Sequence, residues 1–522
     1  KAMNLYLIDI LSKKSQIIAH SPSCEIRDSS FSPDSKWVTY SDNSKNEFSV
    51  INLYNIATGK KYHLTSEYFN SNQPVWDPQG KYIFFVSDRY FDATGGNFEY
   101  NYIFQDMANI YGITLSGNDL NPFSIYETDI KVPKDTLKDE ETSKDKKVKK
   151  KANNEEKEII IDLDKIADRI FELPTPNGNY YGLYAFDGKL YYTRSSSSSK
   201  PSLYSYDLKT KEETDLGNAG RYVISSDGKK ILASKGKDYY ILKLGTKLDF
   251  KEGKLDLSKL ELYLDRKAEW KQIFTEAWRQ FKYFFYDPNM HGNDWDAIYK
   301  KYAQMLPYVS HRADLTFLIG EMIGELNVGH AYVGGGDMPK VTPVKIGLLG
   351  ARFKLDKQSG FYQITKILEG RNWEEESRSP LTEPGLKVKE GDFIIAIDDE
   401  PLTAENHPYK ALNNKANTYV KLTINNKPSK DGAWDIYVKT INSEEKLVYL
   451  NWVENNRRYV EKATNGRIGY IHIPDMGFDN GLREFAKYFY PQLDKEGLII
   501  DDRYNGGGNV SPLVIERLRR EI

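Results

Sequence analysis

The sequence predicts a multidomain chain in which an all-β propeller, a helical segment, a second β-rich module and an α/β unit follow one another. Three observations lead to this fold class. A strand-and-turn pattern repeats within residues 1–260, apolar residues adopt a helical period after Glu269, and a strand–helix–strand pattern leads into Gly506–Gly508. Because single cores stop growing near about 250–300 residues, a chain of 522 residues is expected to divide into several domains.

Residues 1–260 contain a repeat that predicts the blades of a β-propeller. The run Phe31–Tyr40, a turn that leads into a strand, returns 45 residues later as Trp76–Phe85, and weaker copies begin at Phe186 and Ser226. A period of about 40–50 residues with several short strands is typical of propeller blades and leaves room for roughly five or six of them. The turns resemble those of TolB-like propellers rather than WD40 repeats. A β-array that is not a propeller is the alternative.

Residues 131–158 interrupt this pattern. The segment consists mainly of Lys, Asp and Glu and has almost no large apolar side chains. Because such a segment cannot bury enough surface to order itself, it is predicted to be a flexible, disordered insertion within one blade. An interaction tail is the alternative.

Residues 261–340 are predicted to be helical and to end in a candidate functional histidine. A helix is predicted from Glu269, a second near Asp296, and a third over Arg312–Leu326, which leads through Gly329 to His330. His330 is therefore expected on a turn between this helix and a short strand. Histidine is the natural general base near neutral pH, so His330 is a catalytic candidate, with a plain surface imidazole as the alternative. The apolar face of the first helix comprises Trp270, Ile273, Phe274, Ala277, Trp278, Phe281, Phe284 and Phe285.

Residues 341–455 resemble a PDZ domain. The resemblance rests on Gly385–Leu402, which contains a Gly-Asp-Phe-Ile core followed by a turn at Asp399-Glu400 in place of the usual Asp/Asn-Gly. PDZ domains add a peptide as an extra strand and hold its terminal carboxylate with backbone N–H groups. Whether this module binds substrate or only braces the fold is left open.

Residues 456–522 predict a βαβ unit that ends in a glycine-rich loop. The strand around Ile468–Ile473, a helix from Asn480 and a buried strand over Leu498–Asp501 are expected to make a parallel pair. The glycines of the following loop allow backbone N–H groups to approach a ligand. Ser511-Pro512 is interpreted as a hydroxyl N-cap with proline at the first helical position.

Two common uses of glycine-rich loops do not match this one. The Walker pattern ends in Gly-Lys-Ser/Thr, whereas this loop continues as Asn509-Val510-Ser511. The dinucleotide fingerprint needs spaced glycines, whereas these are contiguous. Two interpretations of the loop remain: an oxyanion hole, or a tight turn that uses glycine for its positive φ.

The composition excludes several further classes. With 73 Lys+Arg against 75 Asp+Glu, the net charge of −2 provides no field that would attract nucleic acid or an anionic membrane. No run is apolar enough for a membrane span. The single cysteine, Cys24, excludes intramolecular disulfides and a cysteine-based zinc site, and no metal or cofactor is predicted. No signal peptide is expected before the first strand.

The order of the parts, together with three motifs, resembles the tricorn-type serine peptidases of family S41, the C-terminal processing protease superfamily. The motifs are Phe285–Gly292, Gly324–Tyr332 and Asp502–Gly508, and the resemblance covers nearly the whole chain. The implied domains are a partial propeller at 1–260, a helical N-terminal part of the peptidase core at 261–340, a PDZ domain at 341–455 and the α/β C-terminal part of the core at 456–522.

The resemblance implies a role for each candidate residue. His330 would be the general base that activates a serine, and the backbone N–H of Gly507, with Gly508 as second choice, would stabilise the oxyanion. Tricorn has a serine directly before its histidine, whereas this chain has Gly329. The resemblance implies that the nucleophilic serine and a later glutamate follow the glycine run, so both are expected beyond Ile522. Ser511 is interpreted as a helix cap rather than as the nucleophile.

Two functions from different classes follow from these expectations. The first is a serine peptidase that cleaves short peptides and assembles into a homo-oligomer, a hexamer by resemblance. The second is a catalytically inactive propeller–PDZ scaffold that binds peptides. The compartment stays open: tricorn itself suggests the cytoplasm, and exported bacterial relatives suggest the periplasm.

Overall fold

A computed structural model describes residues 3–22, 25–95, 102–123, 159–245 and 247–520. The chain divides into two compact units, Lys1–Met338 and Pro339–Ile522, each described here by itself. The insertion predicted at 131–158 lies outside the described residues. The three boundaries between the four predicted domains stay predictions, and the one between residues 455 and 456 falls inside a continuous helix.

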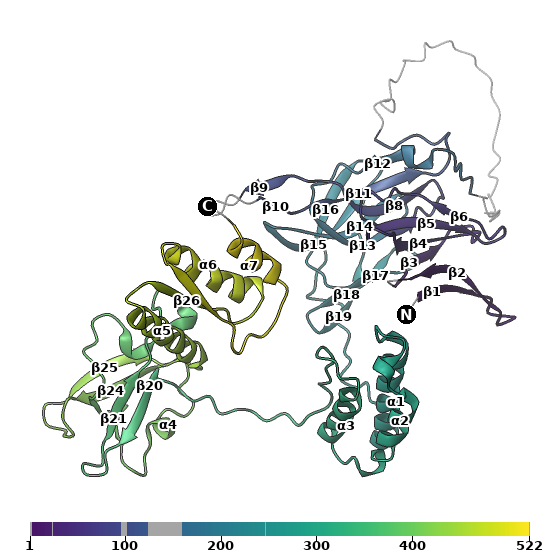
Figure 1. Ribbon diagram of the computed structural model, residues 1–522. Helices are drawn as coiled ribbons and strands as arrows, with labels where there is room; N and C mark the ends of the chain where they lie inside the picture. The colour runs from purple at the N-terminus through teal and green to yellow at the C-terminus, as the bar shows by residue number, and fades with distance from the viewer. Residues whose placement is uncertain (1–2, 23–24, 96–101, 124–158, 246, 521–522) are drawn as a thin grey trace, which may run out of the picture. The chain divides into compact units, whose positions relative to one another are not determined.

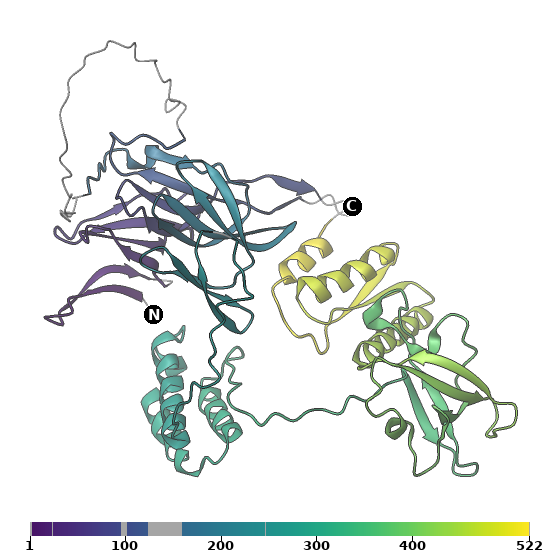
Figure 2. The same ribbon diagram turned by 180° about the vertical axis from the view of Figure 1, so that it is seen from behind.

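The N-terminal part of the first unit consists of antiparallel sheets that follow one another in chain order (Figures 1 and 2). The sheets are β1 (Met3–Ile8) with β2 (Ser15–Ser21); β3 (Arg27–Phe31), β4 (Trp37–Asn43), β5 (Ser49–Asn55) and β6 (Lys61–His63); β7 (Ser71–Trp76), β8 (Tyr82–Asp88), β11 (Ala108–Thr114) and β12 (Ile170–Glu172); β13 (Asn179–Phe186), β14 (Lys189–Ser196), β15 (Ser199–Asp207) and β16 (Glu212–Gly217); and β17 (Tyr222–Ile224), β18 (Lys230–Lys235) and β19 (Asp238–Lys243). A hairpin of β9 (Ala93–Gly95) and β10 (Tyr102–Phe104) and a short 3-10 turn, η2 (Ile166–Arg169), complete this part.

Hydrophobic clusters join each of these sheets to the next, as expected for propeller blades. Ile18 packs with Val38 and Tyr54, so the first pair of strands contacts the second sheet. Further clusters join the second sheet to the third, the third to the fourth and the fourth to the fifth. The five sheets agree with the five or six blades that the repeat predicted.

The first and last copies of the repeated turn have the same side-chain hydrogen bonds, which helps to explain the sequence repeat. In the first copy the Ser32 hydroxyl donates to Asp34 over 2.6 Å and accepts from the Trp37 N–H over 3.0 Å. In the last copy the Ser225 hydroxyl donates to Asp227 over 2.7 Å and accepts from the Lys230 N–H over 2.9 Å. Each copy therefore closes a turn that starts the next strand.

The rest of the first unit is helical and packs around one core. Its helices are α1 (Arg266–Phe284), α2 (Trp295–Ala303) and α3 (Arg312–Gly324), with short 3-10 turns η3 (Met290–Gly292) and η4 (Leu306–Tyr308). His311 caps α3 in a capping box with Asp314. Two details of the prediction are wrong: Phe284 is 61% exposed, and residues 331–333 form no strand.

The second unit begins with the predicted PDZ module. Its sheet contains β20 (Ala351–Leu355), β21 (Tyr362–Ile367), β22 (Phe393–Ile397), β24 (Tyr419–Asn425) and β25 (Trp434–Lys439), with β23 (Glu400–Pro401) paired to β22. Short helical elements η5 (Glu375–Ser377), η6 (Pro380–Thr382) and α4 (Pro408–Ala411) complete it. The strand β22 is buried along its whole length, which places the Gly-Asp-Phe-Ile core of the motif at the centre of the sheet.

The C-terminal elements form the predicted βαβ unit. They are α5 (Glu445–Ala463), β26 (Ile468–His472), a π-helical turn η7 (Phe478–Leu482), α6 (Arg483–Phe489), η8 (Tyr490–Gln492), β27 (Gly497–Asp501) and α7 (Ser511–Leu518). The strands β26 and β27 are parallel. Alternate side chains of β26 face opposite ways: Tyr470 and His472 contact α5, and Ile471 packs with α6 and α7.

Two local predictions in this part are wrong. The strand β27 was expected to be buried, but Ile499 and Ile500 are 45% and 38% exposed in the described chain. The N-cap position of α7 is occupied by Val510, and Ser511 is the first helical residue, without a side-chain cap. The apolar run and the Ser-Pro pair are local signals, and neither reports which neighbouring elements cover a strand or where the first helical hydrogen bond forms.

Candidate functional site

The glycine loop lies at the carboxyl end of the parallel pair β26–β27, where α/β sheets tend to bind ligands. Backbone hydrogen bonds join it to the segment after β26. The Gly506 N–H donates to the Pro474 carbonyl over 2.9 Å, and the Met476 N–H donates to the Gly507 carbonyl over 2.8 Å. The Asn505 side-chain amide donates to the Ile473 carbonyl over 2.9 Å. The loop is thus held along its length rather than at its ends alone.

The three glycines are not equivalent. Gly508 has φ +144°, and a Cβ there would lie 2.3 Å from the Met476 carbonyl oxygen. Gly507 has φ +79°, but a Cβ there would meet open space. Gly506 has no positive φ, and its nearest neighbour, the Asp475 Cβ, would be at an ordinary 3.7 Å. Glycine is therefore required most strictly at Gly508.

The N–H groups of the two candidate donors also differ. The Gly507 N–H donates to the Asn505 side-chain oxygen over 2.7 Å, an Asx turn within the loop. The Gly508 N–H makes no hydrogen bond to any residue that the structure describes, and the residue is exposed. Of the two donors predicted for an oxyanion, Gly508 is the one whose N–H is available.

The start of the loop is held by a charged pair. The Arg503 guanidinium donates to both oxygens of Asp501, with Nη2 at 2.6 Å from Oδ2, and the Tyr470 hydroxyl donates to the same carboxylate over 2.7 Å. Hydrogen bonds from Arg503 lower the pKa of Asp501 well below its usual range, against the opposing effect of burial. The carboxylate is therefore charged at neutral pH and orients Arg503 at the entrance to the loop.

This pair predicts an acid-sensitive contribution to stability. Because the pKa of Asp501 is lower in the folded state than the unfolded value of about 3.9, its stabilisation is present above that pH and is lost as the pH falls below it. Urea unfolding between pH 2 and pH 7 should show a smaller acid-induced loss of unfolding free energy in Asp501→Asn than in the wild type. Asp502→Asn, a change at the neighbouring exposed aspartate, is the control. The prediction would be contradicted if the unfolding free energies of Asp501→Asn and the wild type fell equally as the pH is lowered.

His330 lies in the other unit, on a turn that follows α3. The side chain is exposed, and its ring makes no hydrogen bond to the residues that the structure describes. The nearest aromatic neighbour is Tyr332, edge-on at 6.4 Å between ring centroids. A Cβ added at Gly329 would have no other atom within 4 Å, so a serine there would meet open space.

The motif Phe285–Gly292 holds the segment that joins α3 to His330, at Leu326, four residues before the histidine. The His291 ring Nδ1 lies 2.8 Å from the Leu326 carbonyl, and its backbone N–H donates to the Asp287 carboxylate over 2.8 Å. The Asn293 amide donates to the Glu325 carbonyl over 3.1 Å. A carbonyl only accepts, so Nδ1 is the protonated ring nitrogen of His291. The motif contributed to the family resemblance, which implied no role for it. Its contacts indicate that it anchors the segment before His330.

Removal of this anchor should loosen the His330 turn. In His291→Ala the buried Leu326 carbonyl loses its donor, a change that costs about 1–2 kcal/mol. Amide hydrogen exchange in residues 324–332 should become faster, and His291→Asn, whose Nδ2 can replace Nδ1, should restore most of the protection. Equal exchange in His291→Ala and the wild type would show that the turn does not depend on this contact.

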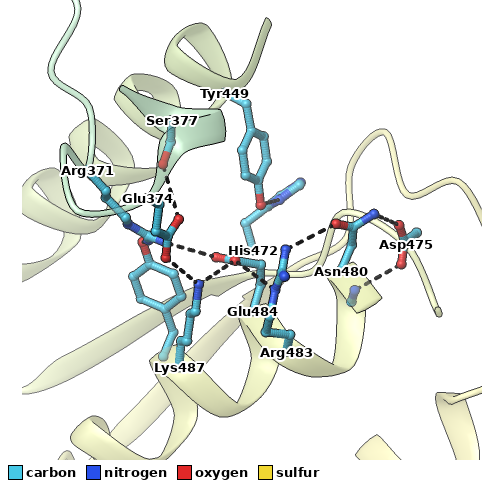
Figure 3. A network of polar contacts seen from close by, with 12 residues as sticks. Arg371, Glu374, Ser377, Tyr449, His472, Asp475, Asn480, Arg483, Glu484 and Lys487 are labelled. Atoms are coloured by element: carbon cyan, nitrogen blue, oxygen red, sulfur yellow. Dashed lines mark hydrogen bonds and ion pairs between the residues drawn. The ribbon is translucent and has the colours of Figure 1, made fainter. Parts of the chain in front are cut away.

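Sequence reasoning missed His472, which contacts the start of the loop from outside it, and Tyr449, which contacts His472. The His472 imidazole lies between the Tyr449 hydroxyl and the Arg503 carbonyl. Figure 3 shows both side chains beside a polar network that extends to Glu484 on α6 and Lys487. The alternation of β26, which turns His472 toward the preceding helix, was the available signal.

No three His, Cys, Asp or Glu side chains in the described part of the chain are grouped so that they could hold a metal ion. Among the described helices, none has the length and apolar character to cross a membrane.

Four family models match this chain in order. They are the tricorn protease second β-propeller domain at residues 1–245, the tricorn protease C1 domain at 266–324, the tricorn protease PDZ domain at 347–443 and peptidase family S41 at 467–518. These matches confirm the predicted propeller, PDZ and S41 parts, and identify the helical segment with the C1 domain.

Individual proteins agree with the family models. The chain is 32% identical to a tricorn protease homologue of Saccharolobus solfataricus over 99% of its own length and 46% of that protein. It is 28% identical to the tricorn protease of Thermoplasma acidophilum, over 98% of this chain and 46% of that protein. A crystal structure of the tricorn protease superposes with a TM-score of 0.82 at 26% identity, over 99% of this chain and 49% of that one.

The curated relatives are longer than this chain, which spans between 43% and 58% of their lengths. The family models nevertheless match four consecutive domains of this chain. The chain is therefore a tricorn protease homologue that contains the second propeller, the C1 and PDZ domains and part of the S41 peptidase domain.

Proposed function

We propose that this chain provides the general base and the oxyanion donor of a serine peptidase that hydrolyses short peptides. The observation on which the proposal depends is the N–H of Gly508, which has no hydrogen-bond partner among the described residues. It lies on a loop held at Gly506 by Pro474 and at Gly507 by Met476. A donor that is fixed in place before the substrate arrives needs no reorganisation when charge develops, which is how an oxyanion hole lowers a barrier.

In the proposed reaction, His330 accepts the proton of a serine hydroxyl while its oxygen attacks the carbonyl carbon of the scissile peptide bond. The carbonyl oxygen becomes an oxyanion and accepts a hydrogen bond from the Gly508 N–H. The C–N bond then breaks, and His330 returns the proton to the departing amine. Water repeats these steps on the acyl-enzyme ester, with His330 again as the base, and releases the second product.

The nucleophile is proposed by resemblance to belong to a Gly-Ser-Asp-Gly-type turn after residue 522, together with a later glutamate. Ser511 does not have the helix-cap contact that the sequence suggested, so that argument against it no longer applies. Its place at the first position of α7, after the loop rather than in a turn of the family type, leaves the downstream serine as our proposal.

We further propose, by resemblance, that the propeller filters the peptides that reach the site and that the protein assembles into a homo-oligomer.

The test uses the full-length protein. Wild-type enzyme should hydrolyse fluorogenic oligopeptides and react with a fluorophosphonate probe, and mass spectrometry of the labelled peptide should locate the serine. Labelling of Ser511 would overturn the assignment of the nucleophile. Tight peptide binding without turnover and without labelling would overturn the peptidase proposal and leave the peptide-binding scaffold.

A further inference from the structure

We infer that His472, oriented by Tyr449, is a positioning residue that holds the glycine loop in the conformation needed for the Gly508 N–H to act. This inference rests on the proposed function for its effect on catalysis. Its structural part, the hold on the loop, can be tested separately.

His472 is built into the sheet beneath the loop. It is the last residue of β26, pairs in register with Asp501 of β27, and is only 2% exposed. Its ring packs edge-on against Trp452 at 4.7 Å and against Tyr449 at 5.4 Å between centroids. The imidazole therefore has one orientation, fixed by two aromatic rings of α5.

The two ring nitrogens have different partners. Nε2 lies 2.8 Å from the Arg503 carbonyl oxygen, and Nδ1 lies 3.1 Å from the Tyr449 hydroxyl. A carbonyl only accepts, so Nε2 must bear the proton, and in the neutral ring Nδ1 then accepts from the Tyr449 hydroxyl. The hydrogen bonds run in one direction, from Tyr449 through His472 to the backbone of the loop.

The surroundings of Tyr449 keep its hydroxyl protonated, so that it can donate a hydrogen bond. Burial, with the nearby Glu484 carboxylate as a further cause, raises the pKa of Tyr449 above its usual range. The hydroxyl therefore stays protonated. Removal of the hydroxyl would leave Nδ1 buried without its donor and weaken the preference for the tautomer that serves Arg503.

The Arg503 carbonyl, which accepts the hydrogen bond from His472, precedes a turn with a strained backbone. Tyr504, the next residue, has φ +62°, a conformation that is unfavourable for a tyrosine, and its side chain is 90% exposed. Little side-chain packing therefore stabilises the turn, although Trp452 lies edge-on to the Tyr504 ring at 6.2 Å. The hydrogen bond to Arg503 from outside the loop stabilises this backbone, which leads directly to the glycines.

The variants separate the hydrogen bonds from the bulk of the side chains. His472→Leu removes both hydrogen bonds, whereas His472→Gln keeps an amide N–H that can reach the Arg503 carbonyl. Tyr449→Phe removes only the hydroxyl. Tyr459→Phe removes a hydroxyl from the exposed side of the same helix and is the matched control.

The first measurement on the full-length protein is kcat and KM with an oxoester substrate and its thionoester analogue, whose sulfur is a weaker acceptor in an oxyanion hole. We expect His472→Leu to lower kcat for the oxoester by about 10²-fold, the scale of losing one oxyanion donor, and to lower the oxo-to-thiono rate ratio. His472→Gln should recover most of both. Tyr449→Phe should show a smaller loss of kcat, about threefold to tenfold, with KM and Tm close to wild type.

The second measurement is amide hydrogen exchange in residues 503–510, which does not depend on catalysis. Faster exchange in Tyr449→Phe than in Tyr459→Phe supports the hold on the loop, even if His472→Leu fails to fold. Unchanged exchange and an unchanged rate ratio in Tyr449→Phe would overturn the inference. A wild-type protein without hydrolysis, but with the expected exchange difference, would refute the peptidase proposal and leave the structural hold in place.

Discussion

Replacing His330 with alanine in the full-length protein is expected to lower kcat/KM for fluorogenic peptides by about a thousandfold or more. In the proposed mechanism His330 is the group that accepts the serine proton, and positioned general bases contribute about 10²–10⁴-fold. Labelling by a fluorophosphonate should fall in parallel, because the unactivated hydroxyl is a weak nucleophile. KM should change far less than kcat, since the base acts on the transition state rather than on bound substrate.

The control for this variant is His63→Ala. His63 is an exposed histidine of the propeller strand β6, so its loss tests whether removal of any surface imidazole lowers activity. Because His330 is also exposed, its truncation should leave Tm within about 1–2 °C of wild type. Full activity of His330→Ala would show that His330 is not the general base and would favour the alternative of a surface histidine without a catalytic role.

Alanine substitutions in the glycine run should have graded effects, with the largest at Gly508. In Gly508→Ala the new Cβ would meet the Met476 carbonyl oxygen at 2.3 Å, so either the backbone of the loop or that of the opposite segment must move. Strain at this φ costs about 1–3 kcal/mol, and displacement of the donor should lower kcat by about 10²–10³-fold.

The other two glycines are matched controls. Gly507→Ala has room for the Cβ but an unfavourable φ of +79°, so it should lose about 1–2 kcal/mol of stability and only part of the activity. Gly506→Ala should resemble the wild type. Peptide hydrolysis and thermal unfolding of the three variants together test the assignment. A larger loss of activity in Gly507→Ala than in Gly508→Ala would favour Gly507 as the donor and contradict our proposal.

Much of the architecture could be predicted because its signals are local. The turn of each propeller copy depends on residues two to five positions apart, such as Ser32 with Asp34 and Trp37, so the repeat is visible in the sequence. The helices of the C1 domain likewise follow from apolar spacing along one face. The motifs around His330 and Gly508 identified the family, because side-chain type and spacing are themselves the signal.

The tertiary structure decided what depends on residues distant in the chain. The difference between Gly507 and Gly508 arises from Met476, which lies far earlier in the sequence, and from which N–H the Asn505 side chain already occupies. Covering of the β27 side chains likewise depends on neighbouring elements, so an apolar run could not report it.

The sequence by itself determined the order of domains, the family and the residues to examine. Only the tertiary structure showed that His472 contacts Tyr449 and the Arg503 carbonyl, and that His291 holds the helix that precedes His330. The physical reason is the range of the interactions: turns and helices are specified by neighbours in the chain, whereas the orientation of a catalytic backbone group is specified by hydrogen bonds between separate elements.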